Sequence, residues 1–199
     1  MPSETQSDYK KISSPPAYVS LGSNLGNRLS AIIDALIELQ NLSLQPLTVS
    51  SIWETTPVNC PINTPMFLNA AAMITPPPDV QPETLLKKLQ DIEVKLGRNP
   101  KEKGEKLPRI IDIDLITFGD YIRDLPELTL PHKNAIQRKF VLLPLSQLSP
   151  HLVLPGHTQT INEYLIKLVS NETLTELLPA SEVMNQLNLR LKSFSSKIK

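Results

Sequence analysis

The sequence lacks several features that would place it among secreted, membrane-spanning or nucleic-acid-binding proteins. It contains one cysteine, Cys60, which excludes a disulfide within the chain. No apolar run approaches the roughly 20 residues that a membrane-spanning helix needs. The 20 basic and 20 acidic residues cancel, so no overall charge attracts nucleic acid or anionic lipid. We therefore expect a cytoplasmic protein without nucleic-acid or membrane partners, in which any phosphate site is built locally.

The length and composition favour one folded domain. The 199 residues, 40% of them hydrophobic, suffice for a sizeable core and fit a single domain. Residues 1–14 have neither an apolar stretch nor an Arg-rich pattern, which argues against an export or transit signal. We expect a disordered tail over residues 1–15, a folded domain over residues 16–178, and a helical extension with a frayed end over residues 179–199. We also expect a monomer.

Hydrophobic periodicity predicts four strands and two helices in the first 118 residues. Short apolar or β-branched runs predict strands over residues 17–21, 47–53, 67–74 and 110–118. Helical spacing predicts one helix that is capped by Ser23 or Asn24 and ends near Gln40, and a second over residues 83–96. This order predicts an α+β, ferredoxin-like fold, in which the helices pack on one face of an antiparallel sheet.

Beyond residue 119 the pattern is less regular. It predicts a short strand over residues 128–130, a short helix over 140–148, a longer helix over 161–178 and a further helix within 181–199. Residues 55–65 are rich in Pro and Asn and predict a long loop. Residues 22–28 predict a tight turn with a helix cap, because they lack the G-K-[ST] ending of a phosphate loop.

Two aspartates in the fourth predicted strand are the strongest candidates for metal ligands. Alternation along a strand points the side chains of Asp112 and Asp114 to the same face, about 6.6 Å apart. Magnesium prefers oxygen ligands and is commonly held by one or two carboxylates together with substrate phosphates. The alternative is that both carboxylates simply lie on a solvated face of the strand.

A basic loop over residues 98–109 precedes this strand. It begins with Arg98 and delivers Arg109 three residues before the first aspartate. Guanidinium groups bind phosphate oxygens bidentately and offset the charge that develops in phosphoryl transfer. A solvated charge run is the alternative, and it explains Lys103 and Glu105 better than it explains Arg109.

Aromatic and amide side chains suggest a site for a flat heterocycle. Strand alternation places Phe67 and Asn69 on one face, where the ring can stack and the amide can pair with ring donors and acceptors. Phe140 could supply a second stacking face, and His132 could donate to a nucleotide. The alternative is that these residues belong to the core and to turns.

Several separated segments together resemble the 6-hydroxymethyl-7,8-dihydropterin pyrophosphokinase family. They match the family pattern in order and spacing, and they extend to about Pro150: residues 19–27, residues 55–57 through 67–70, residues 96–98, residues 108–114 and residues 130–145. The resemblance implies transfer of pyrophosphate from ATP to the pterin hydroxymethyl group, with release of AMP. It also implies two Mg²⁺ ions held by Asp112 and Asp114, with Arg98 and Arg109 acting on the ATP phosphates from a lid.

The same resemblance assigns the remaining site positions. Phe67 and Phe140 would sandwich the pterin and Asn69 would bind its edge, while the rest of this site would be lined by Thr55, Pro57 and Val58. The ATP site would include Arg98 and Arg109 together with Gln90, Glu93, Leu115, Thr129, His132 and Arg138.

The chain departs from the family pattern within the lid. Pro100 replaces a frequent basic residue, and Lys106 and Leu107 replace a common Trp-Gly pair, so the resemblance leaves the lid geometry and the ATP affinity open. Two other functions are compatible with a ferredoxin-like sheet. A metal-dependent nucleotidyl transferase or cyclase can use an acidic pair, but it leaves Phe67 and Asn69 unexplained. An RNA-binding module would need sheet aromatics and basic surface that this sequence lacks.

Overall fold

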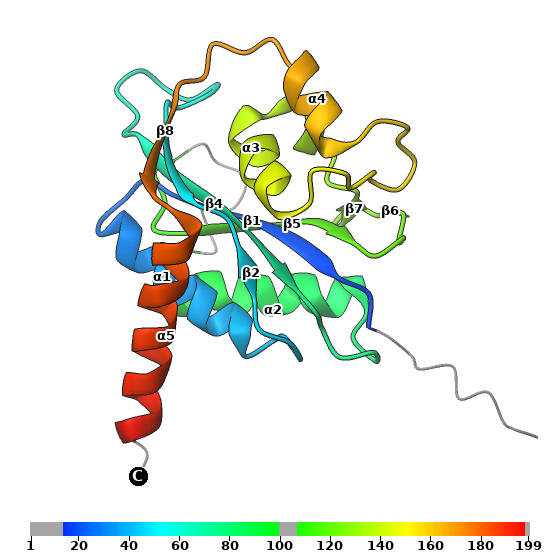
Figure 1. Ribbon diagram of the computed structural model, residues 1–199. Helices are drawn as coiled ribbons and strands as arrows, with labels where there is room; N and C mark the ends of the chain where they lie inside the picture. The colour runs from blue at the N-terminus through cyan, green and yellow to red at the C-terminus, as the bar shows by residue number, and fades with distance from the viewer. Residues whose placement is uncertain (1–13, 100–106, 198–199) are drawn as a thin grey trace, which may run out of the picture.

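The computed structural model describes residues 14–99 and 107–197. The tail expected over residues 1–15 lies almost entirely outside these ranges, as does most of the basic loop, including Pro100 and Lys106. Within the described residues, a six-stranded antiparallel sheet forms the centre of the molecule (Figure 1).

The strand order of this sheet is β5-β1-β4-β3-β8, and β2 also pairs with β4. Every pairing is antiparallel. The strands are β1 (Ala17–Ser23), β2 (Thr48–Val49), β3 (Ile52–Thr55), β4 (Phe67–Ile74), β5 (Asp112–Phe118) and β8 (Leu174–Leu178). The four strands β5-β1-β4-β3 have the order of a ferredoxin-like sheet, which confirms the predicted α+β fold.

Helices cover both faces of the sheet (Figure 1). One face carries α1 (Arg28–Gln40) and α2 (Pro82–Lys95), with α5 (Ala180–Lys197) packed beside α1. The other carries α3 (Lys139–Leu148) and α4 (Ile161–Lys167). The prediction that helices pack on one face was therefore incomplete. A small hairpin of β6 (Arg123–Asp124) and β7 (Thr129–Leu130) precedes the 3-10 helix η2 (Ala135–Gln137).

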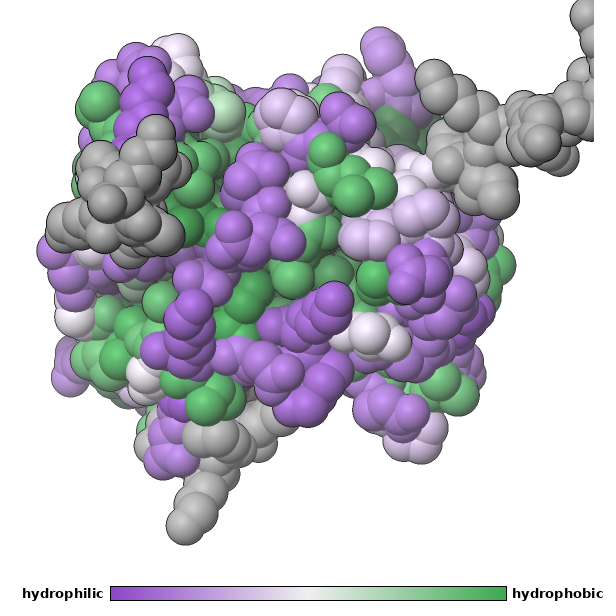
Figure 2. Space-filling view, turned by 90° about the horizontal axis from the view of Figure 1, so that it is seen from below, coloured by the Kyte–Doolittle hydropathy of each residue, from purple (hydrophilic) through white to green (hydrophobic). Residues whose placement is uncertain are grey.

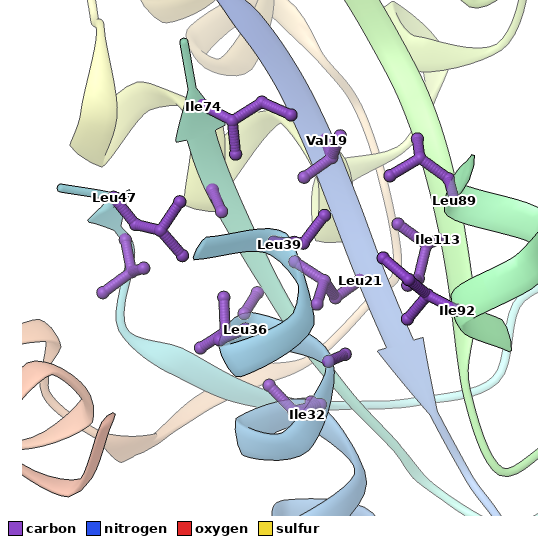
Figure 3. Packing of buried hydrophobic residues seen from close by; sticks show 14 of the residues in the cluster. Val19, Leu21, Ile32, Leu36, Leu39, Leu47, Ile74, Leu89, Ile92 and Ile113 are labelled. Atoms are coloured by element: carbon purple, nitrogen blue, oxygen red, sulfur yellow. The ribbon is translucent and has the colours of Figure 1, made fainter. Parts of the chain in front are cut away.

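Strand alternation divides the buried side chains into two cores. Val19, Leu21 and Ile113 point toward α1 and α2, where they meet Ile32 and Leu89 in the main core (Figure 3). Residues at the intervening positions of the same strands face α3, where the second core includes Tyr18, Ala71, Ile116, Val141, Leu142 and Leu145. The sheet is therefore buried on both faces over part of its area, and its α3 face also carries polar side chains.

The strand predicted over residues 47–53 is broken in two. At the break, Ser50 Oγ accepts a hydrogen bond from the Ala71 backbone N–H at 2.8 Å and donates one to the Ser51 carbonyl at 2.7 Å. The Ser51 N–H turns away and donates to Gln147 Oε1 at 3.0 Å. Serine side chains thus replace part of the backbone ladder, as their tendency to bind nearby backbone groups allows.

Two helix predictions were wrong in their boundaries. Strand β1 continues through Ser23, and α1 is capped by Asn27, whose side chain accepts from the Ser30 N–H at 3.1 Å. The helix predicted over residues 161–178 ends at residue 167, and β8 follows because residues 174–178 pair with the edge of β3. Tertiary pairing overrides local helical spacing here.

The C-terminal extension forms α5, whose Val183 and Leu187 are buried in the main core. An ion pair between Arg190 and Asp34 also joins α5 to α1. Seen from below, the face that carries these helices presents hydrophilic side chains spread between hydrophobic ones (Figure 2). Within the described ranges, no helix is long and apolar enough to cross a membrane.

Candidate active site

The candidate site side chains project from the α3 face of three adjacent strands. Asp112 and Asp114 occupy alternate positions on β5, as Phe67 and Asn69 do on β4. Between them on β1, Gly22 pairs in register with both Asn69 and Asp112. A Cβ atom at Gly22 would lie 3.1 Å from Asn69 Oδ1, so glycine gives the Asn69 amide its place.

The first cavity has a volume of about 430 Å³. Its walls come from β1, the β3–β4 connection, β5 and the segment that enters α3. Asn69 is nearly fully buried, and its Nδ2 donates to the equally buried Thr55 Oγ1 at 2.7 Å. The cavity contains five of the six predicted pterin residues, which are Thr55, Val58, Phe67, Asn69 and Phe140.

The second cavity, of about 240 Å³, lies between α2, β5 and the segment around β7. Six of the predicted ATP residues line it, namely Gln90, Glu93, Arg98, Leu115, Thr129 and His132. Asp112 and Asp114 line both cavities. The carboxylate pair therefore lies where a ligand in the first cavity would meet a ligand in the second.

Two arginines neutralise Asp112 in this structure. Arg98 Nη1 donates to Asp112 Oδ1 at 2.5 Å, and Arg109 Nη1 donates to Oδ2 at 2.7 Å. Arg98 also pairs with the buried Glu93, whose Oε1 accepts the Ile113 backbone N–H at 2.7 Å. These contacts join α2, the basic loop and β5 in one charged network.

Burial shifts the pKa values of three groups in this network. Burial, with a smaller contribution from Asp112, raises the pKa of Asp114 to about 6. Burial likewise raises the pKa of Glu93 to about 7, against the opposing effect of its bond to the Ile113 N–H. Burial and the nearby Arg138 lower the pKa of His132 to about 4. His132 is therefore neutral near pH 7, and its Nδ1 accepts from the Asn134 N–H at 3.3 Å.

The carboxylates at this boundary are oxygen donors of the kind that magnesium prefers. Asp112 and Asp114 offer oxygen ligands at the boundary of the two cavities. Within residues 14–99 and 107–197, no group of three or more His, Cys, Asp or Glu side chains is placed to hold a metal ion. Magnesium commonly takes one or two carboxylates together with phosphates.

Three predicted site residues are not among those that line the cavity expected for them. Pro57 does not line either cavity, although its neighbour Val58 lines the first. Arg109 and Arg138 line the first cavity, whereas their prediction was for the nucleotide site. The lid itself cannot be placed, because residues 100–106 lie outside the described ranges.

Sequence reasoning missed Asn24, which holds the backbone of Arg109. The Asn24 N–H donates to the Arg109 carbonyl at 3.1 Å, and Asn24 Oδ1 accepts the Arg109 N–H at 2.7 Å. Its place in a segment interpreted as a helix cap concealed this role. Asn134 and Gln137, which also line the first cavity, lie between His132 and Arg138 and have no local signal of their own.

Residues 18–150 match the family described as 7,8-dihydro-6-hydroxymethylpterin-pyrophosphokinase. The chain belongs to this family. The match contains every predicted site residue and both cavities' shared carboxylates.

Two pyrophosphokinases of this family are similar to this chain over most of their own length. A 2-amino-4-hydroxy-6-hydroxymethyldihydropteridine pyrophosphokinase of Porphyromonas gingivalis is 41% identical over 137 residues, which cover 68% of this chain and 91% of the relative. One of Haemophilus influenzae is 35% identical over 167 residues, 82% of this chain and 98% of the relative.

Longer proteins contain the same kind of unit. The folic acid synthesis protein fol1 of Pneumocystis carinii is 33% identical over 185 residues, 93% of this chain, and the chain spans 24% of that protein. A solved HPPK-DHPS structure of Plasmodium falciparum aligns with a TM-score of 0.61 at 16% identity, covering 80% of this chain and 46% of that chain. At this low identity, the structural similarity is evidence for the fold and not for the activity.

Proposed function

We propose that this chain transfers pyrophosphate from ATP to the hydroxymethyl group of 6-hydroxymethyl-7,8-dihydropterin, giving AMP and the pterin diphosphate in folate biosynthesis. The observation that carries the proposal is the position of Asp112 and Asp114 at the boundary of two cavities. An acceptor in the first cavity and ATP in the second would meet at this pair.

The lining of the first cavity suits a flat heterocycle that has hydrogen-bonding edges. Phe67 and Phe140 offer ring faces, and such stacking adds about 0.5–1.5 kcal/mol beyond area burial. The bond from Asn69 Nδ2 to Thr55 orients the amide, with Oδ1 beside Gly22. A preoriented amide recognises a pterin edge without first losing side-chain freedom.

The second cavity suits a nucleotide whose phosphates extend toward β5. Gln90, Thr129 and neutral His132 provide hydrogen-bonding groups, and Leu115 provides an apolar surface. The cations of Arg98 and Arg109 lie at the Asp112 end of the site, so phosphates that reach the carboxylate pair also meet both guanidinium groups.

Asp112 and Asp114 would hold two Mg²⁺ ions, which would supply positive charge that neutralises the ATP phosphates. Asp112 accepts from Arg98 and Arg109, and we expect these guanidinium groups to exchange part of this bonding for phosphate oxygens when ATP binds. Phosphate oxygens are their natural new partners, since guanidinium binds carboxylate and phosphate with similar geometry.

In the proposed reaction, the pterin hydroxymethyl oxygen attacks the β-phosphorus of ATP. The bond from that phosphorus to the oxygen shared with the α-phosphorus breaks, and AMP leaves as the hydroxyl loses its proton. Such a transfer depends on alignment and charge neutralisation more than on a strong base. Phe67, Phe140 and Asn69 would align the acceptor, while Arg98 and Arg109 would offset the developing charge.

The working form and location are part of the same proposal. We expect a monomeric enzyme in the cytoplasm, where the lone Cys60 suits a reducing environment. We place the catalytic domain at residues 16–178, with residues 179–199 as its C-terminal extension.

The deciding assay separates nucleotide products after incubation with ATP, with and without Mg²⁺ and hydroxymethyldihydropterin. We expect AMP and pterin diphosphate only when all components are present. ADP formation, or AMP release without the pterin, would contradict the proposal. Free pyrophosphate together with a nucleotidyl product would instead support the nucleotidyl transferase alternative.

A further inference from the structure

We propose that Glu172 is a positioning residue for the acceptor, because its carboxylate fixes the backbone that carries Arg138 and Phe140 into the first cavity. Glu172 lies beyond residues 18–150, the part of the chain that matches the family. The inference rests on the proposed function, since Phe140 is expected to stack on the pterin.

Glu172 caps α3 from a distant position in the chain. Its Oε1 accepts the Lys139 N–H at 3.2 Å, and its Oε2 accepts the Phe140 N–H at 3.0 Å. The residue at the usual capping position, Arg138, makes no side-chain cap hydrogen bond. A carboxylate there satisfies two free helix N–H groups and complements the positive end of the ten-residue helix.

The carboxylate of Glu172 is itself held in place. Ser170 Oγ donates to Glu172 Oε1 at 3.0 Å and accepts the Glu172 backbone N–H at 3.1 Å. The side chain is therefore oriented from its own segment, and the first turn of α3 is fixed against it. Phe140 belongs to that first turn, and Arg138 is the residue just before α3. The guanidinium carbon of Arg138 lies 5.7 Å from the centre of the Phe140 ring.

The residues next to Glu172 attach to the opposite wall of the first cavity. The Thr56 N–H donates to the Thr173 carbonyl at 3.2 Å, and the Thr173 N–H donates to Thr56 Oγ1 at 3.2 Å. Leu174 then pairs with Thr55 as β8 begins. The connection from α4 to β8 thus runs from the α3 side of the molecule to the edge of β3 (Figure 1).

Residues 172–174 consequently join the two walls between which the acceptor would bind. One wall carries Phe140, and the other carries Thr55 and Thr56. Residues 172–174 attach to Lys139, Phe140, Thr55 and Thr56, none of which lines the second cavity. Loss of the Glu172 carboxylate should therefore loosen the acceptor site and leave ATP binding unchanged.

The test compares Glu172→Ala and Glu172→Gln with the wild-type full chain in the AMP-release assay and by calorimetry with hydroxymethyldihydropterin. We expect Glu172→Ala to raise the KM and Kd for the pterin about fivefold, which corresponds to loss of one helix cap. The KM for ATP should stay within about twofold of the wild-type value, because residues 172–174 do not line the second cavity. Glu172→Gln keeps an acceptor oxygen and should recover much of the pterin affinity.

Glu163→Ala is the matched control. Glu163 also caps a helix, since its Oε2 accepts from the Thr160 N–H at 2.7 Å, but it caps α4 and does not line either cavity. We expect this variant to lower thermal stability without changing either KM. A double-mutant cycle with Phe140→Ala gives a second measurement: Glu172→Ala should cost little further pterin affinity once the ring is gone, because the two residues act through one contact.

An unchanged pterin KM in Glu172→Ala would overturn the proposal, as would equal changes in both KM values or the same effect in Glu163→Ala. Fully additive losses with Phe140→Ala would also overturn it. A wild-type chain that binds neither substrate would instead overturn the proposed function, so the two failures are distinguishable.

Discussion

Asp112 and Asp114 lie two positions apart on β5, yet their removal should affect the metal-free protein in opposite directions. Asp114→Asn should stabilise the fold near neutral pH, because burial and the Asp112 carboxylate disfavour its charged form. Asp112→Asn should destabilise the fold, because Arg98 and Arg109 both donate to this side chain. Both variants should lose turnover by at least about a hundredfold.

The size of the Asp114 effect follows from its pKa, which is raised from 3.8 to about 6. Each unit corresponds to about 1.36 kcal/mol, so the upper limit is about 3 kcal/mol. Asp114 keeps some contact with solvent, and we expect about 1–3 kcal/mol, or a rise in Tm of roughly 3–8 °C. Loss of the ion pairs in Asp112→Asn should cost about 1–3 kcal/mol.

The pH dependence provides the internal check. Between about pH 4 and pH 6 the folded state holds the Asp114 proton and the unfolded state releases it, so this group lowers the free energy of unfolding as pH rises. The increase in the free energy of unfolding in Asp114→Asn should therefore be largest near pH 7.5 and shrink as pH falls toward about 4. Thermal melts with a chelator present measure this. A lower Tm for Asp114→Asn at neutral pH, or a gain of equal size at every pH, would refute the reasoning.

Three further substitutions test the site. Phe67→Ala should weaken pterin binding by about 1 kcal/mol or more and leave the Kd for ATP unchanged, and equal losses measured by calorimetry would contradict the stacking role. Gly22→Ala should raise the pterin KM, because the new methyl group displaces the Asn69 amide from its 3.1 Å approach. Asn24→Ala should lower kcat and raise the KM for ATP, since it removes the side-chain acceptor of the Arg109 N–H, and unchanged kinetics would show that the Arg109 backbone does not need this bond.

The central strands and the carboxylate pair of Asp112 and Asp114 were predictable, because both depend on the alternation of side chains along a strand. Residues 67–74 have the same bounds as predicted, and Asp112 and Asp114 share a face because strand geometry requires it. The failures involve partners that lie far away in the chain. Residues 174–178 become a strand because β3 offers an open edge, and Glu172 caps a helix whose first turn lies 32 positions earlier. The spacing of residues within a segment cannot predict a partner that lies so far away in the chain.

The pairing of β8 with β3 also has a consequence for how the molecule assembles. Thr173 and Thr56 are 117 positions apart, and their contact attaches a strand from late in the chain to one edge of the sheet. As one of the two edge strands, β8 is expected to exchange its amide hydrogens before the central strands β1 and β4 do. The cavity wall that carries Thr55 and Thr56 should therefore open under mild denaturation before the central strands β1 and β4 do.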